Sequence, residues 1–477
     1  MTPHYRRDDP IPLFLLVTTS VQHVLSLSAF LVFPILIGRA AGLSASEMQS
    51  LLGATLIAMG VANFLQASPL TGSGYLCPAG MTAAHLGPSL IAAKLGGLPL
   101  VFGMTLFAGA SEAVLSRFLS RLKVLFPAEV TGVVILLVGV SNATSGFKTL
   151  FPANGSADPN DVAVAGITGA VMIAASVFGS GRLQSLCALI GILVGYVASF
   201  SLGVLKLPDL ASLSHLPLVA LPRVSLVGWS FSPALALPFF VVAFAATAKQ
   251  AGFVACAARL EGGAPENELS RSISRGVMAD ALGTICGGLV GGLAVNVSAS
   301  SSGLISATNI STRRVGYGIA AILFALGFQP HFAAFLSLIP HGIVAAVLVF
   351  TSIFVLLNGM EMIIAAALDR RKTICVGLAV LGGVAVDGTP GVAASAPHAL
   401  LPLLSSSLVA GTTIAIVVNA IFAAQHSLAV SSQPRRRAAR QVIVQHPTPS
   451  DHRSNGQGFS DTGRTASAPG IVASSLK

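Results

Sequence analysis

The chain has 477 residues, of which 53% are hydrophobic and only 9% are charged. A soluble domain carries about 25% charged residues, so this composition excludes a chain built of ordinary soluble domains. The net charge is +10, but most basic residues lie in short loops between apolar segments, which argues against a nucleic-acid-binding surface. With a mean hydropathy of +0.82, the composition predicts an all-α polytopic membrane protein.

The five cysteines are isolated from one another and form no CxxC pair. They are Cys77, Cys187, Cys256, Cys286 and Cys375. This pattern predicts neither a disulfide framework nor a zinc site, and we expect no metal and no other cofactor. The absence of a Walker motif disfavours ATP-driven transport, and the apolar segments hold no nucleophile and base arrangement typical of an enzyme.

Apolar stretches long enough to cross a bilayer recur along residues 11–424, and their number is about fourteen. The clearest predicted spans are 12–37, 47–66, 97–116, 128–147, 162–180, 184–205, 234–258, 276–293, 316–336, 341–358, 373–387 and 403–424. Two further segments, 73–95 and 295–310, are rich in Gly, Ser and Pro. Such backbone is tolerated at membrane depth only where it lines a cavity or is buried in protein, so these segments are predicted to be discontinuous spans 3 and 10.

Loop charges predict the orientation of the chain. With fourteen spans and a cytoplasmic N-terminus, most basic residues fall in cytoplasmic loops, at 117–123, 182, 259–275, 313–314 and 370–372. Arg39 and Lys148 are the exceptions. We therefore expect a cytoplasmic N-terminus over 1–10 and a transmembrane domain over 11–428. Residues 429–477 are polar and predicted to be a disordered cytoplasmic tail.

Two parts of the chain can be laid over one another without a gap. Residues 102–139 match 315–352 so that Gly103 meets Gly316 and Pro127 meets Pro340. Further out along the two halves, Gln22 and His23 fall opposite Lys249 and Gln250, and the two irregular segments fall opposite each other. Seven spans per half give repeats of opposite orientation, about 11–206 and 233–425. This pattern is typical of transporters with a midplane site built from broken helices.

Lys249 is the single charge inside the apolar run 233–258. At 1.5 Å per residue it lies about 15 Å from Arg259, close to the middle of a bilayer core about 30 Å thick. A charged amine at that depth costs several kcal/mol, so Lys249 should face the protein interior or a water-filled cavity and marks a functional site. The alternative is a structural charge that pairs with an acidic residue such as Asp280.

Several sequence pieces in the same order resemble one family, the nucleobase/ascorbate transporters, also called the xanthine/uracil permease family. The pieces are QHVL from Gln22, FPAEVTGVVILLVG from Phe126, ADALGTICGGLVGG from Ala279, GLISAT from Gly303, and SSSLVAGTTIAIVVNAIF in the last span. The resemblance covers roughly residues 12–424. It implies fourteen spans in two inverted repeats, a core and a gate domain, and a homodimer. It also implies a purine or pyrimidine site between half-helices 3 and 10, flanked by spans 1 and 8, with a proton as the coupling ion.

The chain is an atypical member of the family it resembles. Alignment on Gly252 places Lys249 where the family usually holds a glutamate, and Ser300 and Ser301 replace its acidic or amide residue and the following Asn. A charged lysine and the positive ends of half-helices favour an anion. We therefore hypothesise an anionic substrate such as urate or xanthinate. A transporter or exchanger of a small organic or inorganic anion, with Lys249 binding the anion, is the alternative function.

We therefore expect a proton symporter of nucleobase-like solutes in the bacterial inner membrane. The predicted substrate-binding residues are Gln22, His23, Ser73, Gly74, Tyr75, Lys249, Gln250, Phe253, Ser300, Ser301 and Ser302. Tyr75 could stack on a flat ring, and Phe253 shares a helix face with Lys249. Asp280 and Glu112 are rare carboxylates within spans and are the candidates for proton coupling.

Overall fold

The computed structural model describes residues 5–125, 128–151, 157–180, 182–206, 216–222, 228–298, 301, 304–305, 308–365, 368–389 and 407–431. The chain divides into two compact units, Met1–Phe422 and Ala423–Lys477. Of the second unit, the described part is the end of helix α18 (Ser407–Ser431). The rest of the predicted cytoplasmic tail lies outside the described residues.

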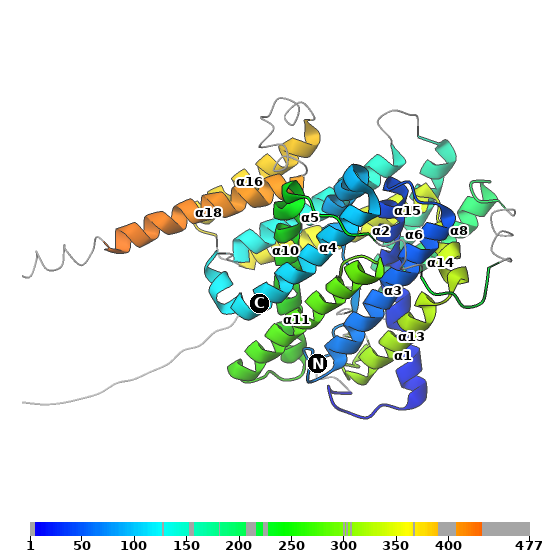
Figure 1. The fold of residues 1–477 in the computed structure, drawn as a ribbon, viewed down its shortest axis with the longest axis horizontal. Helices are drawn as coiled ribbons and strands as arrows, with labels where there is room; N and C mark the ends of the chain where they lie inside the picture. Colours follow the sequence, from blue (N-terminus) through cyan, green and yellow to red (C-terminus); the bar gives the residue numbers. More distant parts are fainter. Residues whose placement is uncertain are drawn as a thin grey trace, which may run out of the picture. The chain divides into compact units, whose positions relative to one another are not determined.

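The first half of the chain is mainly helical (Figure 1). One short strand interrupts its helices. Its elements are α1 (Leu13–Ser28), η1 (Ala29–Leu31), α2 (Val32–Ala40), α3 (Ala45–Ala67), β1 (Ala79–Met81), η2 (Ala83–His85), α4 (Leu86–Leu125), α5 (Ala128–Leu150), α6 (Pro159–Phe178), α7 (Arg182–Ser185) and α8 (Cys187–Ser201). The second half follows the same plan. Its elements are α10 (Pro233–Leu260), α11 (Glu266–Val290), β2 (Val295–Val297), α13 (Arg314–Gly327), α14 (Pro330–Ser337), α15 (His341–Ala365), α16 (Arg370–Gly388) and α18.

Eight of the described helices are long and apolar enough to cross a membrane. Helices α13 and α14 add a ninth span if they are taken together, although they are bent by 79°. The sequence predicts one uninterrupted span over 316–336. The chain instead breaks before Pro330, which begins α14 at a position where the missing N–H costs nothing. Two shorter apolar helices, Cys187–Ser201 and Ser407–Phe422, lie within predicted spans. The described helices do not establish the total, so the number fourteen remains a prediction.

Glycines stand at one break within α4 and at the end of α11. Within α4 the backbone leaves helical geometry at Gly96 and Gly97, which has a φ of 65°. This break separates a short helical segment after β1 from the long part of α4. Helix α11 ends at Gly291, which has a φ of 81° and donates its N–H to Gly287 O. A left-handed conformation of this kind is accessible to glycine at little cost.

The two predicted irregular segments meet as a small antiparallel sheet. Strand β1 pairs with β2 so that Ala79 lies opposite Val297, Gly80 opposite Asn296 and Met81 opposite Val295. The sequence did not predict these strands, but it did pair the segments that contain them. Each strand follows a long helix, α3 before β1 and α11 before β2. The antiparallel direction of the two equivalent strands is what an inverted repeat requires.

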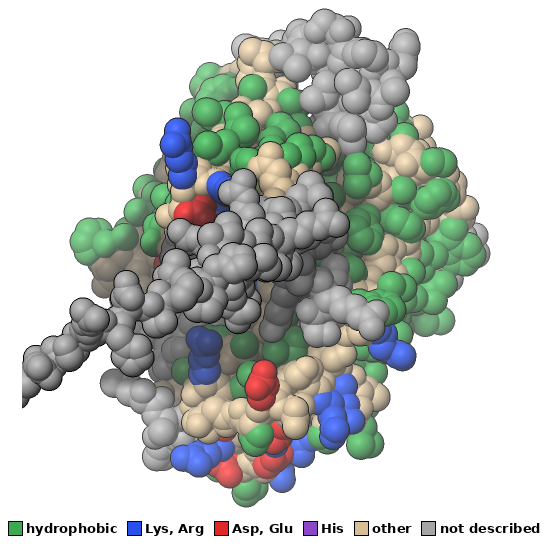
Figure 2. Space-filling model, turned by 90° about the vertical axis from the view of Figure 1, so that its left-hand side faces the viewer, with side chains coloured by type: hydrophobic (Ala, Val, Ile, Leu, Met, Phe, Trp, Pro, Cys, Tyr) green, Lys and Arg blue, Asp and Glu red, His purple; other side chains and the backbone are tan. Residues whose placement is uncertain are grey.

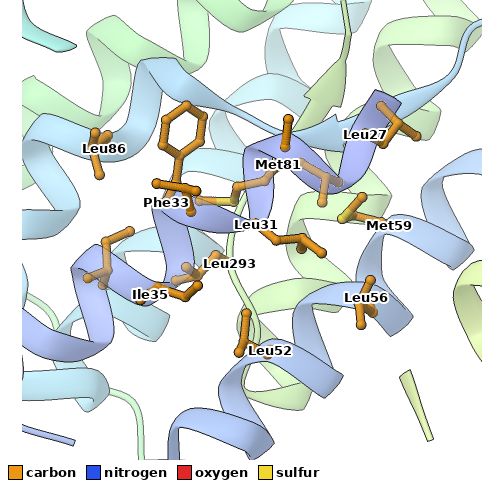
Figure 3. Close-up of a cluster of buried hydrophobic side chains, with 14 of the residues drawn as sticks. Leu27, Leu31, Phe33, Ile35, Leu52, Leu56, Met59, Met81, Leu86 and Leu293 are labelled. Carbon is orange, nitrogen blue, oxygen red and sulfur yellow. The ribbon is translucent and has the colours of Figure 1, made fainter. Parts of the chain in front are cut away.

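A buried apolar cluster packs α1 and α2 against the paired strands β1 and β2, which we call the strand crossing (Figure 3). Figure 3 shows Leu27 and Phe33 beside Met81, with Leu293 approaching from the segment before β2. Leu27 and Phe33 are completely buried. A Cβ at Gly80 would lie 2.8 Å from Leu27 Cδ2, so a larger residue at this position would require the Leu27 side chain to shift. The packing therefore fixes α1 relative to the strand crossing.

The flank of the molecule is apolar, as a lipid-facing surface should be. Figure 2 shows hydrophobic side chains over much of the visible face, whereas many charged side chains gather at its lower end. Large exposed apolar residues include Phe14, Phe178, Val197, Ile364 and Leu381. An exposed apolar surface of this extent is not stable in water but is expected in lipid.

Candidate functional site

The candidate site lies where β1 pairs with β2, because short strands interrupt the helices of both halves there. Asn63 of α3 accepts a hydrogen bond from Ala79 N (3.1 Å) and donates one to Ala79 O (2.7 Å). Thr284 of α11 donates to Val295 O (3.0 Å) and accepts from Val295 N (3.3 Å). Each strand is thus held by a polar side chain of the helix that precedes it. These bonds satisfy irregular backbone at membrane depth and keep the crossing rigid.

Asn296 of β2 connects the crossing to two more helices. Its side-chain amide donates to Ala246 O of α10 at 3.2 Å and to the Asp280 carboxylate of α11. The side chain is buried, and its Oδ1 atom has no hydrogen-bond partner. Asn296 therefore offers a free acceptor while its donors are held by α10 and α11.

Several other buried polar groups near the two broken segments also lack a partner. The atoms are both ring nitrogens of His23, both side-chain amide atoms of Gln250, and the hydroxyls of Thr247 and Ser301. They come from α1, from α10 and from the segment after β2. A buried polar group without a partner costs about 1–3 kcal/mol, and native proteins keep few of them. Their concentration here identifies the best-supported place for a polar ligand.

Lys249 lies on α10 one residue before Gln250 and is partly buried. Among the residues that the structure describes, no carboxylate oxygen lies within 4.0 Å of its Nζ atom. The ammonium still interacts electrostatically with Asp280, the nearby carboxylate on α11. Lys249 and Asp280 therefore form no direct ion pair, and they attract each other only over a longer distance.

Gly276 of α11 brings candidates from the two halves together. A Cβ at this position would lie 3.1 Å from Ser73 Cβ and 3.3 Å from Gln250 Nε2. The Gly276 carbonyl also accepts a hydrogen bond of 2.7 Å from Gln66 Nε2. Ser73 and Gln250 therefore lie around the same glycine, although they are far apart in the sequence.

Tyr75 and Phe253 line one apolar pocket with Leu76, Cys256 and Leu260. The Tyr75 ring already has a cationic neighbour, because the Arg7 guanidinium lies 5.1 Å from the ring centroid. The structure thus places both predicted aromatic residues together, at the α10 end nearer Leu260. Gly74 beside them has a φ of 76°.

The remaining predicted residues occupy different positions. His23 is completely buried on α1, whereas its neighbour Gln22 is only partly buried. Ser301 is buried, and Ser300 and Ser302 lie outside the described residues. The two predicted proton-coupling residues, Glu112 and Asp280, are each 1% exposed.

Sequence reasoning missed the two side chains that hold the strands, Asn63 and Thr284. It also missed His85, which is buried at the start of the short helical segment after β1 with its ring centroid 6.2 Å from that of Phe239. The signal for all three was a lone polar residue in an apolar context near an irregular segment. That signal gives no distance, so it could not separate them from ordinary buried polar residues.

Comparison with known sequences gives a consistent picture. The Xan_ur_permease model, described as a permease family, matches residues 15–390. The uric acid permease PucJ of Bacillus subtilis is 26% identical over 433 residues, which cover 88% of this chain and 95% of that protein. The xanthine permease XanP of Escherichia coli is 25% identical, with coverage of 88% and 94%. The xanthine permease XanQ of Escherichia coli is 28% identical, with coverage of 87% and 93%.

Solved structures of low sequence identity share the fold. Murine Slc26a9, an anion transporter in the inward-facing state, aligns with a TM-score of 0.57 at 9% identity, covering 88% of this chain and 69% of that one. The transmembrane domain of the cyanobacterial bicarbonate transporter BicA aligns with a TM-score of 0.51 at 13% identity, covering 87% and 99%. The likeness shows a helical membrane fold of two inverted repeats, as the sequence predicts.

Proposed function

Since the chain belongs to the xanthine/uracil permease family, we propose that it is a secondary active transporter that moves a nucleobase-like solute across the bacterial inner membrane. Its family consists of transporters and not enzymes. The proposed substrates are a purine such as xanthine or urate, or a pyrimidine. Two of the relatives are described as a uric acid permease and a xanthine permease, which supports this class of solute.

The observation that carries the proposal is the set of unpartnered polar groups beside the strand crossing. An oxopurine presents ring N–H donors and carbonyl acceptors in one plane. Gln250 offers both a donor and an acceptor, and Asn296 offers an acceptor. Loss of such a bond leaves buried polar groups unpaired, which is how a site rejects a solute that lacks the right edge.

We assign roles to the candidates on this basis. Gln250 and Asn296 would form hydrogen bonds with the polar edge of the base. Ser73 and Ser301 would supply hydroxyls beside them. His23 would support the site from α1. Tyr75 and Phe253 would line the route between the site and the end of α10, since they share the apolar pocket there. We also keep Gln22, Gly74, Ser300 and Ser302 as proposed substrate-binding residues, without a more specific role.

Lys249 would favour a base that carries negative charge. Among the described residues it has no carboxylate at contact distance, so its ammonium is left to make a direct contact with a bound solute. An anionic urate or xanthinate would gain more from that contact than a neutral pyrimidine would. The same residue supports the second candidate, transport or exchange of a small anion, which the named relatives support less.

Transport would proceed by proton symport and an elevator-like or rocking motion of a core domain against a gate domain. The protein would work as a homodimer with both termini in the cytoplasm. The buried carboxylates Asp280 and Glu112 would take up the proton, because both lie within helices that cross the membrane.

Uptake of labelled solutes tests the proposal. Cells without their own nucleobase transporters should accumulate labelled xanthine or urate when they express this protein. Gln250→Ala should abolish that uptake, whereas the matched change Gln49→Ala at the start of α3, away from the crossing, should not. Uptake of small inorganic anions without any uptake of bases would favour the second candidate instead.

A further inference from the structure

Three ionisable side chains from three different helices interact electrostatically in the interior. They are Glu112 of α4, Lys249 of α10 and Asp280 of α11. Both Glu112 oxygens and Asp280 Oδ1 are buried without a hydrogen-bond partner.

The packing of α4 against α11 places Glu112 opposite Asp280. A Cβ at Gly109 of α4 would lie 3.0 Å from Ala281 O, so the two helices are in backbone contact there. Further along the pair, Ser274 of α11 donates a hydrogen bond of 2.6 Å to Ser116 O of α4. Glu112 lies between the two α4 contacts, and Asp280 lies between the two α11 contacts.

The third charge lies at a similar depth. Lys249 is 11 residues before Leu260 at the end of α10, and Asp280 is 14 residues after Glu266 at the start of α11. At 1.5 Å per residue these positions are about 16 and 21 Å from the loop that joins the helices. Asp280 interacts electrostatically with both Lys249 and Glu112.

Other ionisable groups near α4 are accounted for. Among the described residues, η2 contributes His85, and the thiol of Cys77 interacts with Asp280. Arg39 of α2 donates to Ile339 O, and Glu129 of α5 pairs with Lys372 at 3.7 Å. The partners of Arg39 and Glu129 are thus outside the cluster, and its formal charges are those of Glu112, Lys249 and Asp280.

These three groups carry a formal charge of −1 when all are ionised, because two carboxylates face one ammonium. Two carboxylates so close together cannot both stay ionised at low cost, and an uncompensated charge in the interior is expensive. Binding of one proton to the carboxylates makes the cluster neutral. The cluster is therefore built to accept and release one proton.

We propose that Glu112 and Asp280 hold the coupling proton between them, with Lys249 balancing the carboxylate that remains ionised. The proposal rests on the proposed symport function and assigns its proton site. A proton leaves a hydronium ion on the side of uptake and forms one O–H bond on the carboxyl pair. That bond breaks on the opposite side, where water accepts the proton.

Asn296 links this proton site to the substrate site. Its amide donates to Asp280, while its free Oδ1 can accept a hydrogen bond from a ring N–H of the solute. A change in the charge of Asp280 therefore changes how firmly the Asn296 side chain is held. This shared residue gives proton binding and solute binding a physical route to influence each other.

Glu112→Gln tests the proposal in proteoliposomes that contain the purified protein. An inward pH gradient of one unit supports about tenfold accumulation of a solute in one-to-one symport. The variant should lose this accumulation and reach an inside-to-outside ratio near 1, while still exchanging labelled for unlabelled xanthine. Glu112→Asp should restore accumulation. Glu361→Gln, which alters an exposed glutamate of α15, should leave it unchanged.

A second measurement does not depend on transport. Infrared difference spectra of the purified wild-type protein at neutral pH should show a protonated carboxyl band that Glu112→Gln removes or shifts. Full accumulation by Glu112→Gln, or an unchanged band in that variant, would overturn the proposal. A wild-type protein that transports no base but shows the band would instead contradict the proposed substrate.

Discussion

Asn296 donates its side-chain amide to the Asp280 carboxylate, joining strand β2 to helix α11 beside the strand crossing. The same amide also donates to Ala246 O of α10. One side chain thus connects the irregular segment of the second repeat to two neighbouring helices. Its free oxygen lies at the place where the other unpartnered groups gather.

Exchanging the two partners tests this hydrogen bond. Asn296→Asp alone removes the donor and sets two carboxylates against each other, so the melting temperature and the uptake of xanthine should both fall. The double variant Asn296→Asp with Asp280→Asn restores one amide and one carboxylate. Its melting temperature should recover at least in part, which can be followed by thermal unfolding in detergent. Equal melting temperatures for the single and double variants would contradict the pairing.

The side chains that hold the two strands, Asn63 and Thr284, should contribute to stability and not to solute recognition. Thr284→Val removes the hydroxyl that both donates to and accepts from Val295. A lost partner for buried backbone costs about 1–3 kcal/mol, so thermal unfolding should occur at a lower temperature. Thr284→Ser keeps the hydroxyl and should remain close to wild type. The affinity of folded Thr284→Val for xanthine should change little, and a selective loss of affinity would assign Thr284 to the solute site.

Close packing of α1 on β1 predicts a compensating pair. Gly80→Ala should destabilise the protein, because the new Cβ would lie 2.8 Å from Leu27 Cδ2. Leu27→Ala alone creates a cavity and typically costs about 2–5 kcal/mol. In the double variant the smaller residue at 27 accommodates the new methyl group, so the two effects should not add. Additive losses in a thermal unfolding cycle would show that the two residues do not share this contact.

Removal of the interior charge should change the preference for solutes. Lys249→Gln keeps a polar side chain of similar length but cannot compensate a negative substrate. We expect uptake of anionic urate to fall by more than uptake of neutral uracil, measured in parallel with labelled solutes. An equal effect on both would indicate that Lys249 acts only on the structure of the site. Lys94→Gln, at an exposed position outside the site, is the matched control.

The sequence was sufficient to predict the membrane class, the inverted repeat and the two irregular segments. Lys249 stood out because one charge in a long apolar run is energetically costly, and this argument requires no structure. The neighbouring Gln250 followed from the repeat, and the two irregular segments followed from their content of Gly, Ser and Pro. These features depend on composition and order along the chain, which the sequence contains directly.

Other features depend on distances that the sequence does not contain. Strands of three residues are too short for an alternating pattern, so β1 and β2 could not be recognised. The role of Asn63 depends on its distance from Ala79, across a turn of irregular backbone. The bend between α13 and α14 was hidden because the apolar character continues through it.

Titration calorimetry with the purified protein tests the central claim, that the polar groups beside the strand crossing bind a nucleobase. Wild-type protein should bind xanthine or urate, and Asn296→Ala should weaken binding by about tenfold or more, equivalent to the loss of about 1.4 kcal/mol. Glu361→Gln should bind as wild type does. Binding of xanthine with the same affinity by wild type and Asn296→Ala, or binding of inorganic anions alone, would contradict the account.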